Sequence, residues 1–201
     1  MTLTKRLDTH FAVCAAAATG AAMFGGEKSQ AAIVYSGVVN LQIANNINGL
    51  YLNMVTGQTS TNGFAGEDIN PYFGGTNMWM APAFGNAAVT TDGTSAQNMP
   101  SGTPVGPSSL FAAGAYPTMG NFLAGQPGLF GIRFMRESDT TLHYGWLRIV
   151  KTTGGNGTVV DYAYEDTANA QILAGATGVP GPGSLALLAV GALGARGRRR
   201  R

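Results

Sequence analysis

Apolar and polar side chains alternate with a period of two over residues 33–43. One face of this segment carries the apolar positions Ile33, Tyr35, Val39, Leu41 and Ile43. The other face carries Val34, Ser36, Val38, Asn40 and Gln42. Such alternation predicts a strand with one buried face. The alternation resumes over 50–55 after asparagine and glycine turn signals, so the sequence predicts that 33–43 and 50–55 form a hairpin.

Three further runs favour strands, at 129–135, 144–151 and 158–165. The last two flank a segment rich in glycine and threonine, 152–157, which is typical of a hairpin loop. In the final run the period of two predicts that Val160, Tyr162 and Tyr164 share one face.

The middle of the chain, 57–128, is rich in loop-forming residues and shows no sustained period. So long a stretch without strands is unusual in a compact domain, so we expect short strands within it. The chain also has 30 glycines, which weaken helices. These features predict an all-β fold over 32–166, an antiparallel β-sandwich of jelly-roll-like type.

The charges are unevenly placed along the 201 residues. The stretch 32–178 has four basic and eight acidic residues, so its formal charge is −4, and the other basic residues lie near the two ends. A mildly acidic body lacks the basic surface that neutralises phosphates, which argues against nucleic-acid binding.

Residues 1–31 have the pattern of a secretory signal helix. Lys5 and Arg6 precede an apolar run at 11–24, and small residues stand before a predicted cleavage between Ala31 and Ala32. An N-terminal helix packed on a cytosolic domain is the alternative. The chain's one cysteine, Cys14, would leave with the signal peptide, so the mature protein would have no thiol and no disulfide.

The C-terminal segment has three parts after a small, polar stretch, 167–178, that the composition predicts as a spacer. A proline-containing motif comes first: Val179, Pro180, Gly181 and Pro182. An apolar run follows at 184–195, and a basic cluster ends the chain: Arg196, Arg198, Arg199, Arg200 and Arg201. We expect a short transmembrane helix held on the cytoplasmic side by the arginines. The run is shorter than the roughly 20 residues of a stable span, which favours a temporary anchor.

These three parts, in this order, resemble the PEP-CTERM sorting tail that exosortases recognise in Gram-negative bacteria producing exopolysaccharide. The family motif has glutamate where this chain has Gly181. The segment 143–165 also looks like the closing region of many PEP-CTERM surface proteins. The resemblance implies processing by signal peptidase and an exosortase-type peptidase, transient anchoring in the inner membrane, and a final place at the cell surface or outside the cell, in association with exopolysaccharide.

Candidate catalytic and metal-binding residues are few. His143 is the one histidine of the segment 32–201, and no Gly-x-Ser-x-Gly motif accompanies it, so we interpret it as a strand residue at the sheet surface. Glu67-Asp68 and Glu165-Asp166 are adjacent carboxylates, whose side chains point to opposite faces of a strand and do not form a glycosidase pair. Either pair, or Asp68 with Asn70, could ligate calcium through oxygen, although turn capping is favoured.

Five aromatic residues could stack on sugars if they are exposed, or fill the core if they are not: Trp79, Trp146, Tyr144, Tyr162 and Tyr164. The sequence thus predicts a non-enzymatic surface or matrix protein without a cofactor, metal site or catalytic residue. A glycan-binding sandwich module and a secreted carboxylate-dependent hydrolase are the alternatives. Exposed aromatics along a groove would favour the former, and converging carboxylates the latter.

Overall fold

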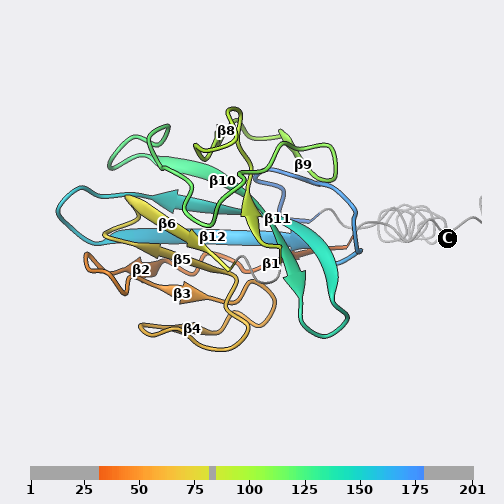
Figure 1. Ribbon diagram of the computed structural model, residues 1–201, viewed down its shortest axis with the longest axis horizontal. Coiled ribbons are helices and arrows are strands. Elements are labelled where there is room, and N and C mark those ends of the chain that lie inside the picture. The colour runs from red at the N-terminus through yellow and green to blue at the C-terminus, as the bar shows by residue number, and fades with distance from the viewer. Residues whose placement is uncertain (1–31, 82–84, 179–201) are drawn as a thin grey trace, which may run out of the picture. The chain divides into compact units, whose positions relative to one another are not determined.

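The computed structural model describes residues 32–81 and 85–178, which form thirteen strands and contain no helix (Figure 1). The predicted signal helix, the cleavage residue Ala31, the motif 179–182, the short apolar helix and the arginines of 196–201 lie outside these residues. Within the described part of the chain, no helix is long and apolar enough to cross a membrane.

A seven-stranded antiparallel sheet is built around three long strands, β10 (Pro127–Arg136), β11 (Thr141–Val150) and β12 (Gly157–Glu165). These correspond to the three runs expected near the end of the body, and β11 and β12 are joined by the expected hairpin loop. Four short strands complete the sheet: β1 (Ile33–Tyr35) and β2 (Leu41–Ile43) pair with β12, and β7 (Ala87–Ala88) and β8 (Asn98–Met99) pair with β10.

A smaller sheet has the order β4 (Thr59–Ser60), β3 (Tyr51–Leu52), β5 (Ile69–Tyr72) and β6 (Asn77–Met80). A third pairing joins β9 (Pro104–Val105) to β13 (Ile172–Leu173). All pairings between strands are antiparallel. The predicted all-β class with antiparallel sheets is therefore confirmed, as are short strands in the middle of the chain.

Two cores lie on opposite faces of the large sheet. The first lies between the two sheets and takes side chains from both: Ile43, Leu52, Ile69, Met78, Met80, Phe130, Ile132, Phe134, Leu147, Ile149, Val159, Tyr162 and Tyr164. The second lies towards β9 and β13: Val89, Met99, Val105, Tyr144, Trp146, Ala163, Ile172 and Ala174. Because β11 and β12 are covered on both faces, apolar residues occupy successive positions along them.

The expected first strand is divided into β1 and β2, both on β12. Gly37 and Asn40 between them have positive φ angles, 71° and 48°, which break the extended chain. The five positions predicted to face inward are buried or half-buried, whereas Val34 and Val38 are exposed. The prediction that the five share one face is wrong, because Ile33 and Tyr35 pack against the second core while Val39, Leu41 and Ile43 lie at the first.

The predicted hairpin between 33–43 and 50–55 is wrong, since β3 pairs with β4 and β5 and not with β2. The connecting segment binds β5 and the turn after it instead. The Leu50 N–H donates to the Pro71 carbonyl at 2.9 Å, and the Gly74 N–H donates to the Ala44 carbonyl at 3.2 Å. These contacts carry the chain into the second sheet. They also require glycine at position 49, where a Cβ would lie 2.1 Å from the Pro71 oxygen.

Val160 does not share a face with Tyr162 and Tyr164, as the period of two predicted. Arg148 pairs with Asp161 but Ile149 pairs with Val159, so Val160 is an extra residue in a β-bulge. The bulge shifts the alternation by one position and places Val159 in the first core with the two tyrosines.

The predicted spacer, 167–178, contains a packed segment. Ile172 and Ala174 are buried in the second core, and the Trp146 indole N–H donates to the Ala176 carbonyl at 3.0 Å. The composition of the segment is mainly small and polar, but it contains two apolar side chains at alternate positions, Ile172 and Ala174. These pack into the second core where β13 pairs with β9.

Candidate functional site

The smaller sheet carries aromatic side chains on its outer face. Asn70 pairs with Trp79 and Tyr72 pairs with Asn77, so these four side chains share one face. The alternate residues of β5 and β6, among them Ile69 and Met80, point into the first core. The sheet therefore has one face buried in the core and a second face that is available for contacts.

A hollow of about 290 Å³ lies on this outer face. Four aromatic rings line it, together with one carboxylate and one amide: Tyr51, Tyr72, Trp79, Tyr116, Glu67 and Asn70. Tyr51, Tyr72, Trp79 and Asn70 come from three neighbouring strands, whereas Glu67 and Tyr116 come from loops. Strands and loops from different parts of the chain thus combine in one site.

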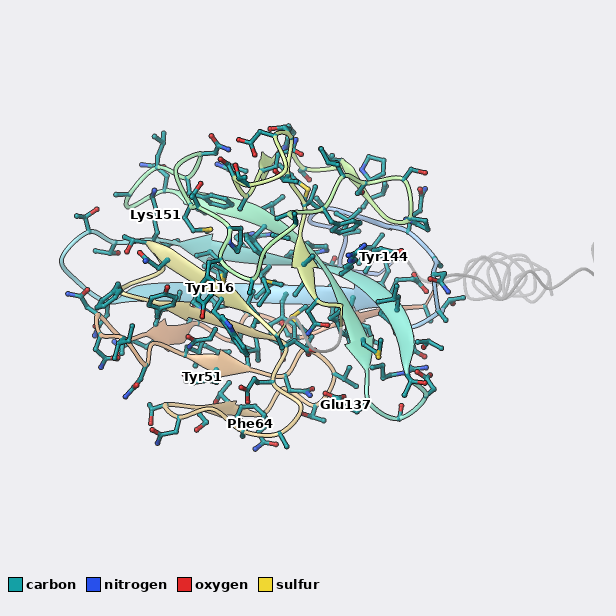
Figure 2. The ribbon with its side chains drawn as sticks, in the orientation of Figure 1. Tyr51, Phe64, Tyr116, Glu137, Tyr144 and Lys151 are labelled. Carbon is teal, nitrogen blue, oxygen red and sulfur yellow. The ribbon has the colours of Figure 1, made fainter. Side chains whose placement is uncertain are left out.

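Tyr116 is placed by a loop that runs beside β6. The Met80 N–H donates to the Ala115 carbonyl at 2.8 Å, and Thr118 forms a bridge with Asn77. Tyr116 remains 66% exposed. Figure 2 shows it between Tyr51 and Lys151. The main chain on both sides of Tyr116 is therefore fixed beside β6, while its side chain stays accessible.

The two polar side chains of the hollow are fixed by the main chain. A Glu67 carboxylate oxygen accepts the Phe64 N–H, and the Asn70 amide donates to the Asn48 carbonyl at 2.7 Å. Gly63 leaves room beside the carboxylate, because a Cβ there would lie 3.3 Å from Glu67 Oε1. Both side chains keep acceptor oxygens, so the site offers acceptors to hydroxyl groups.

A second hollow of about 350 Å³ adjoins the first and shares Tyr72 and Tyr116 with it. Its other lining residues include Asn77 and Lys151, whose ammonium donates to the Met119 carbonyl at 2.8 Å. The two shared tyrosines form part of both walls, so the two hollows are neighbouring parts of one surface.

Of the five aromatic residues singled out in the sequence, Trp79 lines the first hollow. The other four are buried, Tyr144 and Trp146 in the second core and Tyr162 and Tyr164 in the first, which confirms the core interpretation for them. Tyr51, Tyr72 and Tyr116 were missed. The outward-facing position of Tyr51 could have been predicted, since the alternation of 50–55 places it on the face opposite Leu50 and Leu52. Tyr116 stands in a loop, where no sequence pattern indicates its position.

The adjacent carboxylates Glu67 and Asp68 have different surroundings. Glu67 lines the hollow, whereas Asp68 is buried and accepts the Met54 N–H at 2.8 Å and an Asn86 amide N–H at 3.2 Å. Burial is the main cause that raises the pKa of Asp68 to about 7. Asn70 faces the hollow and not this buried site. Across 32–81 and 85–178, no three acidic, histidine or cysteine side chains are grouped as metal ligands.

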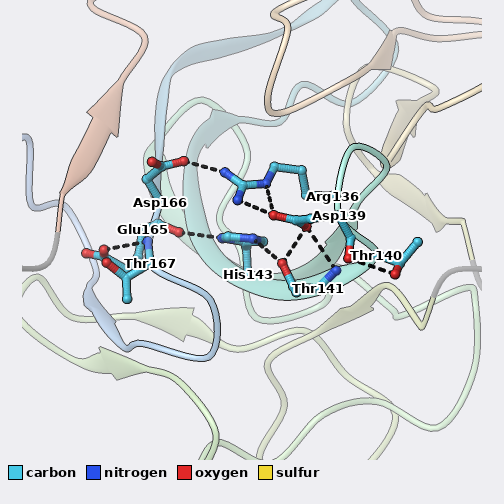
Figure 3. Close-up of polar contacts among 8 residues, drawn as sticks. All are labelled: Arg136, Asp139, Thr140, Thr141, His143, Glu165, Asp166 and Thr167. Atoms are coloured by element: carbon cyan, nitrogen blue, oxygen red, sulfur yellow. Dashed lines mark hydrogen bonds and ion pairs between the residues drawn. The ribbon is translucent and has the colours of Figure 1, made fainter. Parts of the chain in front are cut away.

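Glu165 and Asp166 also diverge (Figure 3). Glu165 is buried, whereas Asp166 is exposed and accepts a hydrogen bond from Arg136 at 2.5 Å. Arg136 also pairs with Asp139. The expectation that neighbouring carboxylates point to opposite sides is confirmed for this pair.

His143 is not at the sheet surface, as the sequence predicted, but completely buried. It faces the first core, with its ring centroid 6.0 Å from that of Phe134. Nδ1 lies 2.8 Å from the Glu165 main-chain oxygen, so it carries the proton, and Nε2 lies 2.8 Å from Thr141 Oγ1. Both ring nitrogens are thus engaged: the Nδ1 contact joins β11 to β12, and the Nε2 contact lies within β11.

Comparisons with models of protein families, with curated proteins and with solved structures found no match. The fold and the site thus define the chain as an antiparallel all-β protein whose smaller sheet carries an aromatic hollow.

Proposed function

We propose that this is an exported, non-enzymatic surface or matrix protein whose β-sandwich body binds polysaccharide at the aromatic hollow. The observation that carries the proposal is the gathering of Tyr51, Tyr72, Trp79 and Tyr116 around one hollow. Aromatic rings present flat apolar surfaces on which the C–H faces of sugar rings can stack, while their polar groups form hydrogen bonds. A concave, mainly apolar site with a few placed polar groups is the usual form of a ligand site.

The polar groups favour a neutral glycan. Glu67 and Asn70 offer acceptors for sugar hydroxyls, and Glu67 is the one charged side chain that lines the first hollow. A negative charge there disfavours uronic acids and other anionic sugars. Because the second hollow continues from Tyr72 and Tyr116, the surface suits a chain of two or more sugar units.

The same geometry supports binding over hydrolysis. Glycosidases generally use two carboxyl groups about 5–9.5 Å apart on either side of the scissile bond. Glu67 is the single carboxylate in the lining of the first hollow, and its neighbour Asp68 is bound to Met54 and Asn86 in the interior.

Export and surface sorting are supported by the sequence at both ends. On this proposal signal peptidase cleaves after Ala31, the apolar run anchors the chain briefly in the inner membrane, and an exosortase-type peptidase acts at 179–182. The intact mass of the protein from its own cells, with and without the sorting peptidase, tests both cleavages. A mass that includes residues 1–31 or 179–201 in exported protein contradicts the corresponding step.

Removing an aromatic ring should weaken polysaccharide binding. We expect Trp79→Ala and Tyr116→Ala each to reduce the affinity for the cells' own exopolysaccharide about tenfold or more, as for an anchor residue at an interface. Affinity electrophoresis or calorimetry measures this. Leu123→Ala is the control, since Leu123 is 70% exposed and lies outside both hollows. Equal binding by all four proteins would exclude the hollow as the site.

Changing the charge should alter which glycans bind. We expect Glu67→Gln, which keeps an acceptor oxygen, to leave binding of a neutral glucan within a few-fold of wild type. The same variant should bind a polyuronate more tightly, because the repulsion between carboxylates is removed. A glycan array read at low and high salt measures both effects. If the wild-type protein prefers the polyuronate, the assignment to neutral glycans is wrong.

A further inference from the structure

A buried carboxyl group on β12 has one oxygen without a partner. Glu165 is completely buried, and its Oε1 accepts two backbone N–H groups, from Ala32 at 2.8 Å and from Thr167 at 2.9 Å. Its Oε2 is also buried, and within residues 32–81 and 85–178 no donor reaches it. A buried acceptor without a donor costs free energy that the fold must otherwise supply.

The charged groups near this carboxyl are already engaged elsewhere. Arg136 pairs with Asp139 and Asp166 (Figure 3). His143 meets Glu165 only at its main-chain oxygen. No side chain of the described residues forms a salt bridge with the Glu165 carboxyl group.

The backbone of Ala32 is held beside this group. The Asp166 N–H donates to the Ala32 carbonyl at 2.9 Å, and the next residue, Ile33, pairs with Glu165 in the sheet. The nitrogen of Ala32 is therefore fixed 2.8 Å from one oxygen of the carboxyl group. This residue is also the one that the sequence predicts as the first of the mature chain.

We propose that Glu165 is the receptor for a free α-ammonium group on Ala32, formed when the signal peptide is removed. Hydrolysis of the Ala31–Ala32 peptide bond consumes one water and leaves a carboxylate on Ala31 and an ammonium group on Ala32. The peptide nitrogen of Ala32 has a single hydrogen, which Oε1 already accepts. An ammonium group has three hydrogens and a positive charge, so it can donate to Oε1 and Oε2 together and neutralise the carboxylate.

This pairing couples maturation to stability. Before cleavage the folded body contains an incompletely bonded buried carboxyl group, and after cleavage the same group is paired. Because signal peptidase acts only after translocation has begun, the folded body gains this stabilising pair outside the cytoplasm and not before export. The inference rests on the export part of the proposed function and is independent of polysaccharide binding.

A double-mutant cycle on processed protein from its own cells tests the pairing. One variant has a glycine inserted between Ala31 and Ala32, so that cleavage after Ala31 moves the amine one residue away from Glu165. The second variant is Glu165→Gln, and the third combines both changes. We expect each single change to lower the Tm by about 5 °C or more, and the combination to lower it little further, because both remove the same pair. Additive losses, or an insertion without effect, would overturn the proposal.

A second measurement uses only the wild-type protein, so it does not depend on whether a variant folds. The α-amine of wild-type protein is treated with an acylating reagent near neutral pH, with and without denaturant, and its modification is followed by mass spectrometry. We expect at least tenfold slower modification in the native protein than in the denatured protein. Equal rates, or a mature N-terminus at a residue other than Ala32, would each contradict the pairing.

Discussion

The folded body should lose stability as the pH rises from about 4 to about 7, and Asp68→Asn should remove most of this loss. Burial raises the pKa of Asp68 from 3.8 to about 7 in the folded protein. A carboxyl group whose pKa is higher in the folded protein than in the unfolded chain makes its full contribution to stability at low pH, where both states are protonated. As the pH rises between the two pKa values, the unfolded chain releases the proton and the folded protein keeps it, so the free energy of unfolding falls. A difference of about three units corresponds to on the order of 4 kcal/mol.

Denaturant unfolding at a series of pH values measures this loss for wild type and variant. Asp92 and Asp139 give an internal comparison, because hydrogen bonds lower the pKa of each, by Ser95 for the former and by Arg136 for the latter. Their contribution to stability is present above pH 4 and is lost below it. Asp92→Asn should therefore leave the window from pH 4 to 7 unchanged. The same slope in wild type and Asp68→Asn would show that another group is responsible.

Gly74→Ala should be among the most damaging single substitutions in the chain. Gly74 has φ = 65°, and a Cβ there would lie 2.2 Å from the Gly155 oxygen and 2.6 Å from the Thr152 oxygen. Both contacts are with backbone, which cannot rotate away. The Thr152 N–H also donates to the Gly74 carbonyl at 2.9 Å, so this glycine joins the β5–β6 turn to the β11–β12 loop. We expect a loss of more than about 3 kcal/mol from strain and overpacking together.

Gly93→Ala is the matched control for this substitution. Gly93 has φ = 83°, but nothing lies within 4 Å of the position that its Cβ would occupy. It should cost only the strain of a left-handed residue, about 1–2 kcal/mol. The free energy of unfolding of both variants separates the two causes. Equal losses would mean that the close approach at Gly74 relaxes at little cost.

The long strands could be predicted because their signal is local. Strands β11 and β12 consist of β-favouring residues joined by a short loop, so neighbours in sequence are neighbours in the sheet. The bulge at Val160 could not be predicted, since an extra residue leaves no mark in composition. The partner of β3 was also missed, because its pairing with β5 depends on backbone contacts between 44–50 and 71–74.

The candidate site was only partly visible in the sequence. Trp79 was weighed as a sugar-stacking residue, and Tyr51 could have been added from its position opposite Leu52. Tyr116 reaches the hollow through the contact between Ala115 and Met80, which no local pattern encodes. His143 was placed wrongly because a single histidine in a β-favouring run does not indicate which face of the sheet is covered. Here both faces are covered.

The hydrogen bond from Trp146 to the Ala176 carbonyl limits how far any enzyme acting on the C-terminal motif can stay from the folded body. Val179 follows Ala176 by three positions, and an extended chain spans at most about 3.6 Å per residue, so the tether is about 11 Å long. On the proposed sorting route, a membrane peptidase must therefore accept the body at the mouth of its active site, or wait until β13 detaches from β9. In the second case the rate of release from the membrane would be set by the local opening of this small ribbon and not by the chemistry of peptide cleavage.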